Sequence, residues 1–415
     1  MDDHQITIAR NYLKGVRGQL VLDGMAVRSA VQVLTIDETD PSRPRFVADS
    51  ANSATAMATG TVTSRGRIST SAKEGRDLQT IVELAQRAGL KTGLVTTSSV
   101  TDATPASFAA HVQNRFCENP DPAVFMKYGT LIDCSGEQKR NGGLGTISEQ
   151  LAVSGLDVLL GGGLKHFTVN AAGSSETVQK LAHNKGFRVI HTKQALNNTS
   201  PGERLLGLFS ASHLAVRLRG ENNRVAEKPT INQQQVEFPA PMGCENNPAY
   251  KNTPPLELMT RKALEILNHD NDSGFFLMIE SASIDKQSHL RNPCGSIGEL
   301  AQLDETLAYV LKFADNHPQT LVIVTADHGQ AAQLVPSETL FSSSTTPVYT
   351  PGSIARIRMQ EGGEMGINYA TNEYSVEEHT GAAVPLYAND VGLGLFKTLI
   401  TQPEIFDIIR SFLRL

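Results

Sequence analysis

Five side chains of the kinds that bind zinc stand in three short segments of the C-terminal half of the chain: Asp285, His289, Asp327, His328 and His379. Carboxylate oxygens and imidazole nitrogens are good zinc ligands, and three protein ligands with one open position make a catalytic site. Asp285 and His289 are four residues apart, so in a helical turn both side chains point the same way. Any one of the five alone would be interpreted as an ordinary polar group, but together they favour a metal centre.

Ser50 is a candidate nucleophile. It follows Asp49 and opens a run of small residues that ends at Gly60. The run predicts a closely packed helix with Ser50 in its first turn, where free N–H groups and the positive end of the helix dipole favour phosphate. The alternative that this segment leaves open is a serine that only caps the helix. Two zinc ions beside a serine alkoxide would catalyse in-line phosphoryl transfer.

The elements that must position these side chains alternate between strand and helix. Strands are predicted at 92–97, 156–160, 275–279 and 321–324, and the last two are continuous apolar runs that indicate burial on both faces. Since ligands of open α/β sheets gather beyond the carboxyl ends of strands, Glu280 and Asp285 after one strand and Asp327 after another fit a shared site. The alternation predicts an α/β fold, a three-layer sandwich whose large, mostly parallel central sheet is flanked by helices.

A helix is predicted at 77–88, ended by Gly89. A second helix is predicted to begin at the capping-box pattern of Ser296 and Glu299, and a third from Thr401 onward. The glycines at 161–163 lack the GK[ST] ending of a P-loop, so a tight strand-to-loop turn is the better interpretation. The Ser/Thr/Pro-rich stretch 342–351 indicates a surface loop. With no repeat or linker in evidence, we expect one domain over 1–415, with an irregular or inserted region at about 168–250.

Bulk composition narrows the class of partner. Lys plus Arg is 37 and Asp plus Glu is 43, a net charge of −6, with no basic stripe, so nucleic acid is not an expected partner. No apolar run approaches the roughly 20 residues that a membrane span needs. The polar residues 1–4 do not form a signal peptide, an absence that leaves the cellular compartment open.

Four cysteines allow three pairings: Cys117, Cys134, Cys244 and Cys294. Local pairing, first with second and third with fourth, is the simplest hypothesis, and four unconnected thiols are the alternative. CxxC spacing does not occur, which argues against a cysteine zinc site or a redox motif. Disulfides would imply an oxidising compartment.

Several segments resemble, in the same order, segments of the bacterial alkaline phosphatases, specifically the dimeric periplasmic enzymes. They are 49–60, 102–106, 111–115, 280–289, 292–295, 324–328 and 378–381. The similarity runs from residue 1 to the end and is weaker at about 168–240 and 335–375. Long motifs in one order are specific to a family. The cysteines also match the family's positions, which favours local pairing.

The resemblance implies a role for each metal ligand. Asp285, His289 and His379 would hold a first zinc, Asp327 and His328 a second zinc, and Thr104 with Glu280 would help to hold a magnesium. The first zinc would stabilise the leaving oxygen and activate water, and the second would lower the pKa of Ser50.

The resemblance also implies that Ser50 becomes phosphoserine during turnover and that Arg115 grips two phosphate oxygens through its planar fork. Asp102 and Lys286 would tune that grip through water. The implied activity is hydrolysis of small phosphomonoesters with release of inorganic phosphate at alkaline pH, by a periplasmic homodimer. Alternatives are a related two-metal phosphodiesterase, sulfatase or phosphomutase, or a metal- and phosphate-binding protein without turnover.

Two departures from the family accompany the resemblance. Family members begin with a buried strand and a Gly-Asp-Gly-Met turn, whose aspartate bridges the second zinc and the magnesium, and this sequence aligns from just after that aspartate. Asp2 and Asp3 are nearby but not at the matching position. We therefore expect the strand and aspartate to be missing, through a truncated or mis-started sequence or a shortened natural protein. Gln330 also stands where relatives often have histidine; its amide can still donate a hydrogen bond to Asp285.

Overall fold

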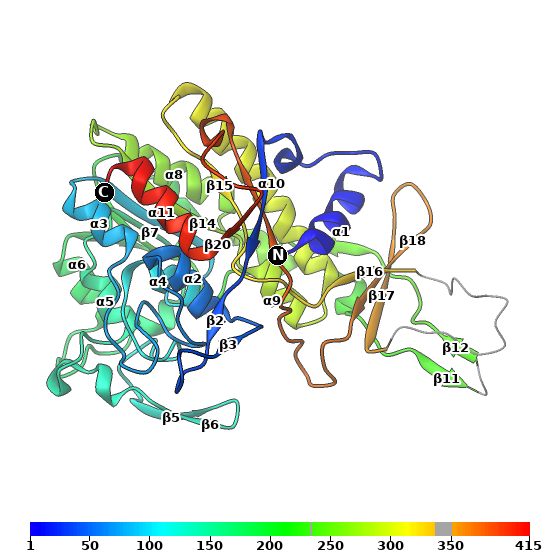
Figure 1. Ribbon diagram of the computed structural model, residues 1–415, viewed down its shortest axis with the longest axis horizontal. Helices are drawn as coiled ribbons and strands as arrows, with labels where there is room; N and C mark the ends of the chain where they lie inside the picture. Colours follow the sequence, from blue (N-terminus) through cyan, green and yellow to red (C-terminus); the bar gives the residue numbers. More distant parts are fainter. Residues whose placement is uncertain (233–234, 337–350) are drawn as a thin grey trace. The chain divides into compact units, whose positions relative to one another are not determined.

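The computed structural model describes residues 1–232, 235–336 and 351–415. Contacts divide the chain into two compact units, each built from several stretches of sequence. Unit 1 comprises Met1–Val31, Ala215–Lys251 and Ser281–Thr398, and unit 2 comprises Gln32–Leu214, Asn252–Glu280 and Leu399–Leu415. Figure 1 shows their elements coloured along the chain.

Unit 2 is built on a five-stranded sheet in the order β14-β4-β7-β9-β8, and every neighbouring pair is parallel. The strands are β4 (Lys91–Ser99), β7 (Val158–Gly162), β8 (Phe187–Ile190), β9 (Arg204–Leu208) and β14 (Phe275–Glu280). Three of them confirm strands predicted from the sequence. β8 and β9 come from the region 168–250, whose weak periodicity had not placed them. Gly163, after β7, has a φ of 96°, a conformation that suits the tight turn predicted there.

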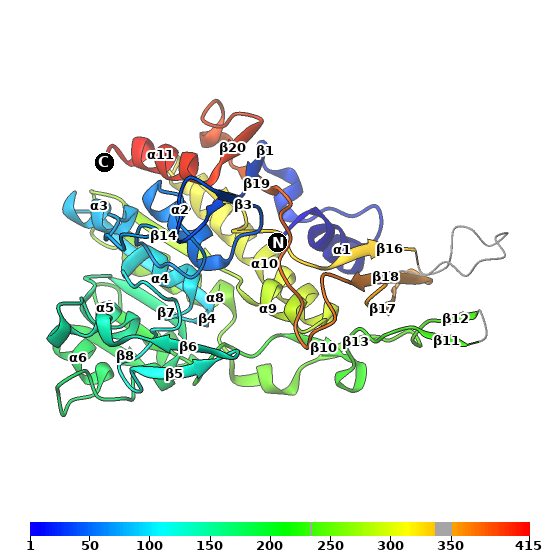
Figure 2. The same ribbon diagram turned by 60° about the horizontal axis from the view of Figure 1, so that its bottom comes forward.

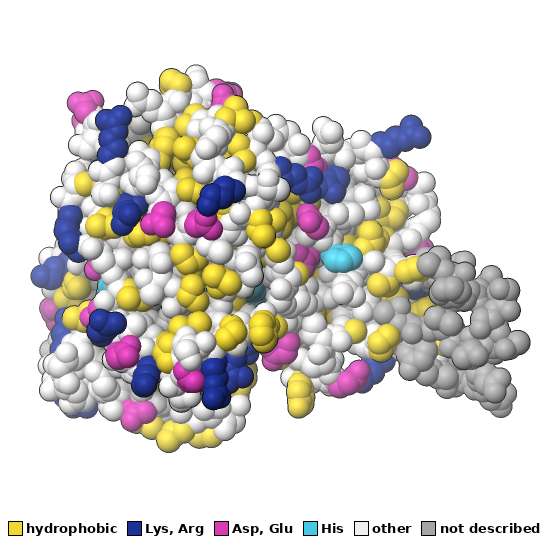
Figure 3. Space-filling model, in the orientation of Figure 1, with side chains coloured by type: hydrophobic (Ala, Val, Ile, Leu, Met, Phe, Trp, Pro, Cys, Tyr) yellow, Lys and Arg dark blue, Asp and Glu magenta, His cyan; other side chains and the backbone are white. Residues whose placement is uncertain are grey.

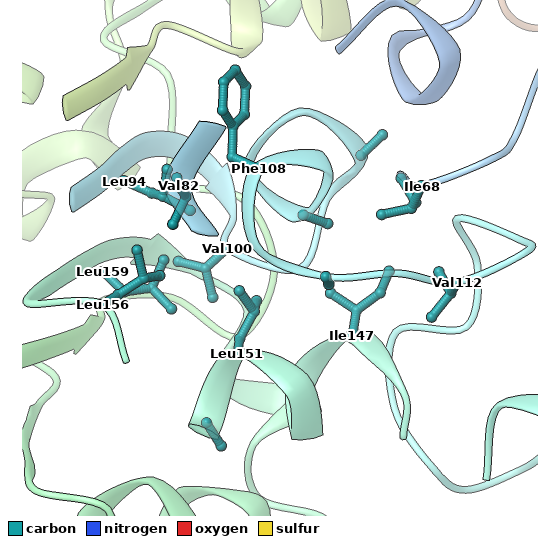
Figure 4. Packing of buried hydrophobic residues seen from close by; sticks show 14 of the residues in the cluster. Ile68, Val82, Leu94, Val100, Phe108, Val112, Ile147, Leu151, Leu156 and Leu159 are labelled. Carbon is teal, nitrogen blue, oxygen red and sulfur yellow. The ribbon is translucent and has the colours of Figure 1, made fainter. Parts of the chain in front are cut away.

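Alternate residues of each strand enter two separate cores, one on each face of this sheet. Leu94, Leu159 and Leu206 join one core and Val95, Val158 and Leu205 join the other. The first core is closed by helices α2 (Ser50–Thr59), α3 (Ile81–Arg87), α4 (Ala103–Ala109), α5 (Ile147–Val153), α6 (Val178–Asn184) and α11 (Gln402–Leu413) (Figure 2). Figure 4 shows side chains of this core, among them Phe108 of α4 and Leu151 of α5. The second is closed by α7 (Lys193–Asn197) and α8 (Leu256–Asn268). This helix–sheet–helix arrangement confirms the predicted three-layer α/β fold.

Two predicted helix starts were wrong and one was confirmed. α3 begins at Ile81 after a Thr80 cap, later than predicted, because the Thr80 side chain already accepts from the Glu83 N–H. α10 (Pro293–Asn316) begins before the Ser296 pattern, because Asn292 caps it and proline at the first position needs no N–H partner. Thr401 caps α11 as predicted.

Unit 1 contains helices α1 (Asp3–Lys14), α9 (Ser283–His289) and α10, together with short antiparallel ribbons. β19 (Val384–Ala388) pairs antiparallel with both β1 (Val27–Gln32) and β15 (Ile323–Val324). The predicted strand at 321–324 is therefore shorter than expected and not part of a parallel pair, a distinction that an apolar run alone does not encode. The other ribbons are β10 (Leu218–Gly220) with β13 (Cys244–Asn246), β11 (Thr230–Asn232) with β12 (Gln235–Glu237), and β18 (Glu364–Tyr369) with β16 (Gln333–Val335) and β17 (Ser353–Arg358).

Both expected disulfides are present, Cys117–Cys134 in unit 2 and Cys244–Cys294 in unit 1, so local pairing is confirmed. Within the described ranges, no helix combines the length and hydropathy that a bilayer span requires. Figure 3 shows basic and acidic side chains interspersed on the face drawn. The predicted surface loop at 342–351 lies, up to residue 350, outside the described residues.

Candidate functional site

Helix α9 presents two of the predicted ligands from one face, as their spacing of four residues predicted. Asp285 lies in its first turn and His289 is its last residue. Oδ2 of Asp285 is 3.4 Å from Nε2 of His289. The short helix therefore delivers a carboxylate and an imidazole to the same point in unit 1.

Two loops of unit 1 bring the other three ligands to that point. His379 comes from the loop before β19, and its Nε2 is 3.0 Å from Nε2 of His289 and 3.6 Å from Oδ1 of Asp285. His328 follows β15, and its ring stacks on His379 with centroids 3.6 Å apart. Oδ2 of Asp327 is 3.1 Å from Nε2 of His328. All five ligands predicted from the sequence thus belong to one cluster.

The chemistry of this donor set fits a divalent metal. Ligand atoms of Asp285, His328 and His379 lie within 4.8 Å of one another. Nδ1 of His289 hydrogen-bonds to the Glu377 carbonyl, and Nδ1 of His328 lies 3.2 Å from the Gly329 carbonyl. Because a carbonyl oxygen only accepts, each Nδ1 is the donor, which leaves each neutral ring with a lone pair on Nε2. That tautomer, fixed by an outer hydrogen bond, is the one that ligates zinc through Nε2.

Charges within the cluster keep its carboxylates ionised. Burial alone would raise the pKa of Asp285, but the neighbouring His289 and His379 hold it well below its usual range. Asp327 responds in the same way to His328, which lowers its pKa despite burial. In return, the carboxylates raise the pKa of His289 and His328 against the opposing effect of burial. A bound cation would therefore displace protons from the histidines, which makes metal binding pH-dependent.

Gln330 orients one carboxylate of this cluster. Its side chain is buried, and Nε2 donates to Oδ1 of Asp285 over 2.6 Å, the bond that the sequence indicated an amide could make. The Gln330 backbone N–H in turn donates to Oδ2 of Asp2 over 3.2 Å. Lys286, expected to tune the grip of Arg115 on phosphate through water, occupies the position after Asp285 in α9.

In unit 2, Ser50 is the first residue of α2, and Asp49 is the cap. The Asp49 carboxylate accepts from the N–H groups of Asn52 and Gly66, each over 3.1 Å. The interpretation of Ser50 as a cap is therefore wrong, since the residue before it performs that task. Ser50 sits where the free N–H groups of the first turn favour an anion.

Arg115 links the starts of two helices in unit 2. Its Nη1 donates to Oδ2 of Asp49 over 3.1 Å, and its Nη2 donates to Oδ1 of Asp102, the cap of α4, over 3.0 Å. Asp102 was expected to act through water, but its contact with Arg115 is direct. Burial would lower the pKa of Arg115, yet the two carboxylates outweigh it and raise the pKa, so the guanidinium is both oriented and permanently charged.

The two residues expected to hold magnesium also belong to unit 2. Glu280 ends β14, and its Oε2 accepts from Thr96 Oγ1 over 2.5 Å and from Ser98 Oγ over 3.4 Å. Thr104 lies in the first turn of α4. Carboxylate and hydroxyl oxygens are the hard donors that magnesium prefers.

The sequence did not reveal residues whose partners lie far away along the chain. Asp49 as a partner of Arg115 had one local signal, its cap position before Ser50. His213 had none: its Nδ1 accepts from the Ser99 N–H over 3.2 Å and lies 3.8 Å from Oδ2 of Asp102. Glu377, which contacts His289, also escaped notice.

Comparison with known proteins identifies the family to which this sequence is similar. Residues 1–374 match the family described as alkaline phosphatase. The chain is 38% identical over 400 residues to streptomycin-6-phosphate phosphatase of Streptomyces griseus, covering 94% of this chain and 82% of that protein. It is 37% identical over 428 residues to alkaline phosphatase of Escherichia coli K12, covering 100% and 84%.

Solved structures agree in fold. Alkaline phosphatase from the Antarctic bacterium TAB5 superposes with a TM-score of 0.70 at 22% identity, covering 100% of this chain and 95% of that one. The Thermus thermophilus enzyme gives a TM-score of 0.70 at 20% identity, covering 99% and 88%. One TAB5 mutant structure, with a TM-score of 0.69 at 22% identity over 100% and 95% of the chains, is described as having Mg bound in its M3 site.

Proposed function

The chain belongs to the alkaline phosphatase family, a family of phosphomonoester hydrolases, and we propose that it cleaves small phosphomonoesters through a phosphorylated Ser50. The observation that carries this proposal is the convergence of Asp285, His328 and His379, whose ligand atoms lie within 4.8 Å of one another. A carboxylate and two imidazoles at that spacing have the composition of a zinc centre.

We assign two zinc ions and one magnesium to the chain's own ligands. Asp285, His289 and His379 would hold one zinc, Asp327 and His328 the other, and Thr104 with Glu280 would hold the magnesium. When bound, the zinc ions would act as Lewis acids toward the attacking and leaving oxygens. The oriented Nδ1 donors of His289 and His328 support the zinc assignment, and Thr96 and Ser98 hold Glu280 in place.

The chain's own side chains would perform the displacement. Ser50 Oγ attacks phosphorus, a new O–P bond forms, and the bond to the substrate's alcohol oxygen breaks. Water then attacks the phosphoserine, which frees Ser50 and releases inorganic phosphate. Each step inverts phosphorus, so the overall result is retention.

Arg115 would bind two phosphate oxygens during both steps. Asp49 and Asp102 already hold its guanidinium at the N-termini of α2 and α4, so little side-chain freedom is lost when phosphate binds. The family resemblance implies that Lys286 would tune the grip of Arg115 through water.

The family includes a relative with a named substrate. Streptomycin-6-phosphate is itself a phosphomonoester, so the Streptomyces griseus enzyme is consistent with this reaction. A phosphodiester or a sulfate ester carries less negative charge than a terminal phosphate. Arg115 and the proposed magnesium ligands suit the doubly charged terminal phosphate. We therefore favour the monoesterase with a broad substrate range and an alkaline optimum.

An oxidising compartment fits the two disulfides, and the periplasm is the compartment we propose. The resemblance of the sequence to the dimeric enzymes of this family leads us to propose a homodimer.

Trapping the intermediate tests the proposal. The zinc-loaded protein would be incubated with a phosphomonoester, quenched in acid and digested, and the peptide containing Ser50 examined by mass spectrometry. We expect one added phosphoryl group on Ser50 and none in the chelator-treated sample. A phosphoryl group on another residue, or turnover without any, would contradict the assignment of the nucleophile.

A further inference from the structure

Glu377 is a fully buried carboxylate beside the metal-ligand cluster, with an exposed fraction of 0%. Its Oε1 accepts from Nε of Arg291 over 2.6 Å. Its Oε2 accepts from the Thr371 backbone N–H over 2.9 Å and from the Thr371 hydroxyl. The carboxylate thus ties together two stretches of unit 1 that are far apart in the sequence.

The backbone of Glu377 contacts a proposed zinc ligand at both of its polar atoms. Its N–H donates to the His289 carbonyl over 3.0 Å, and its carbonyl accepts from Nδ1 of the His289 ring. His379, a second proposed ligand of the same zinc, lies two residues further along the same loop. Any movement of Glu377 would therefore change the direction of the His289 ring and the approach of His379 together.

Arg291 holds the other side of this junction. It lies two residues after His289, just beyond the end of α9, and has a φ of 56°, an uncommon conformation for a residue with a side chain. While Nε donates to Glu377, Nη2 donates to the Tyr374 carbonyl over 2.6 Å. One guanidinium therefore grips both the carboxylate and the backbone of the loop that carries His379.

Stability alone does not account for such a pair. Removing two charges from water costs about as much as their attraction returns, and apolar residues of similar volume often serve equally well. The hydrogen bonds of the buried Glu377 and the half-buried Arg291 all converge on the loop and the helix end that hold two proposed ligands, so the pair is better explained by what it orients.

We propose that Arg291 and Glu377 are positioning residues for the first zinc: they lock the loop 371–379 against the end of α9, so that His289 and His379 face a single cation. The inference rests on the proposed function, because it takes these histidines as zinc ligands. Neither residue touches substrate or metal in this scheme.

Zinc affinity of the metal-free protein tests the proposal without any use of activity. Zinc would be titrated into the full chain against a chromogenic competing chelator, for the parent and for Glu377→Ala. We expect the tightest site of the variant to bind about 10–100-fold more weakly, the range for losing an outer partner of a ligand. The control is Glu373→Ala: Glu373 lies on the same loop, is exposed, and forms its ion pair with the exposed Lys228. Its zinc affinity should equal the parent's.

A second variant and a second signal keep the test decisive. Arg291→Ala removes the partner of Glu377 but leaves the Thr371 bonds to it, and it should also weaken zinc binding at the first site. This variant provides the test if Glu377→Ala does not fold. With cobalt in place of zinc, the visible absorption of the first site should change in both variants and not in Glu373→Ala. The contrary result is a variant that has the same melting temperature as the parent in the metal-free state and still binds zinc and cobalt as the parent does. That result would overturn the positioning role and leave the proposed metal site in place. A parent that binds no zinc would overturn the metal site and this inference together.

Discussion

The buried side chain of Gln330 donates through Nε2 to Oδ1 of Asp285, a proposed ligand of the first zinc, over 2.6 Å. The orientation of the amide is fixed, because its Oε1 accepts from the Ala331 N–H over 2.8 Å. An uncharged donor thus directs one lone pair of the carboxylate and leaves Oδ2 facing His289. Many metal sites orient a ligand in this way.

Removing that donor should loosen zinc. Gln330→Ala leaves Asp285 without its buried partner, so we expect the zinc dissociation constant of the first site to rise about tenfold or more. Gln330→His restores a donor that can carry charge and should shift the constant less, although not to the parent's value. Gln333→Ala, at an exposed position of β16, serves as the control. Equal constants for the parent, Gln330→Ala and Gln330→His would refute this role.

Ser50→Ala should abolish turnover while the protein still binds zinc and phosphate, because only the nucleophile is removed. Steady-state hydrolysis and phosphate binding would be measured on the same sample. Ser53→Ala is a matched control on the same helix: Ser53 Oγ is buried and has no hydrogen-bond partner in the part of the chain described here. That control should retain full activity. Undiminished turnover in Ser50→Ala would exclude the phosphoserine mechanism.

Arg115→Ala should weaken binding of inorganic phosphate. Two hydrogen bonds from a charged guanidinium are lost, each contributing about 1.5–3 kcal/mol, so the inhibition constant should rise about 100–10,000-fold. Zinc content should not change, since Arg115 is not one of the five proposed zinc ligands. Arg115→Lys keeps the charge but not the fork, and an intermediate constant is expected. A phosphate inhibition constant unchanged in Arg115→Ala would contradict the assignment.

His111 gives the protein a pH-dependent contribution to stability that is independent of metal. Its Nε2 is 3.1 Å from Oε1 of Glu83, and its Nδ1 is 3.0 Å from the Ser69 carbonyl. Burial would lower the pKa of His111, but Glu83 and Ser69 raise it above 6.5, while the pKa of Glu83 falls below 4.5 despite burial, through His111.

The sign of the effect follows from these shifts. The contribution of His111 to the free energy of unfolding is complete below pH 6.5 and is lost as the pH rises through its folded pKa. The contribution of Glu83 is present above pH 4.5 and is lost at lower pH. His111→Gln should therefore destabilise the protein more at about pH 6 than at about pH 9, by about 1 kcal/mol after allowing for the partial exposure of Glu83. Urea unfolding in chelator at the two pH values would measure it; an equal loss at both would rule out a protonated His111.

Local patterns in the sequence predicted much of the fold and the metal cluster. The local pattern marked β4, β7 and β14 as strands. The four-residue spacing of Asp285 and His289 indicated that both side chains would point the same way if they stood in a helical turn, which α9 supplies. The Ser296 pattern failed because an earlier cap at Asn292 had already started α10.

What the sequence did not predict is pairing at long range. Glu377 is 88 residues from His289 and 86 from Arg291, and no local spacing reports such a contact. His213 reaches Ser99 across 114 residues from a region of weak periodicity. Ligand types can be read from a sequence, whereas the residues that hold the ligands in place depend on tertiary packing.

The central claim is tested most directly by hydrolysis of a chromogenic phosphomonoester at alkaline pH by this chain, with bound zinc counted in the same sample and a chelator control. The account predicts turnover that the chelator abolishes and added zinc restores, with close to two zinc ions per chain. Turnover that survives complete removal of metal would contradict it, as would a protein carrying both zinc ions that releases no phosphate.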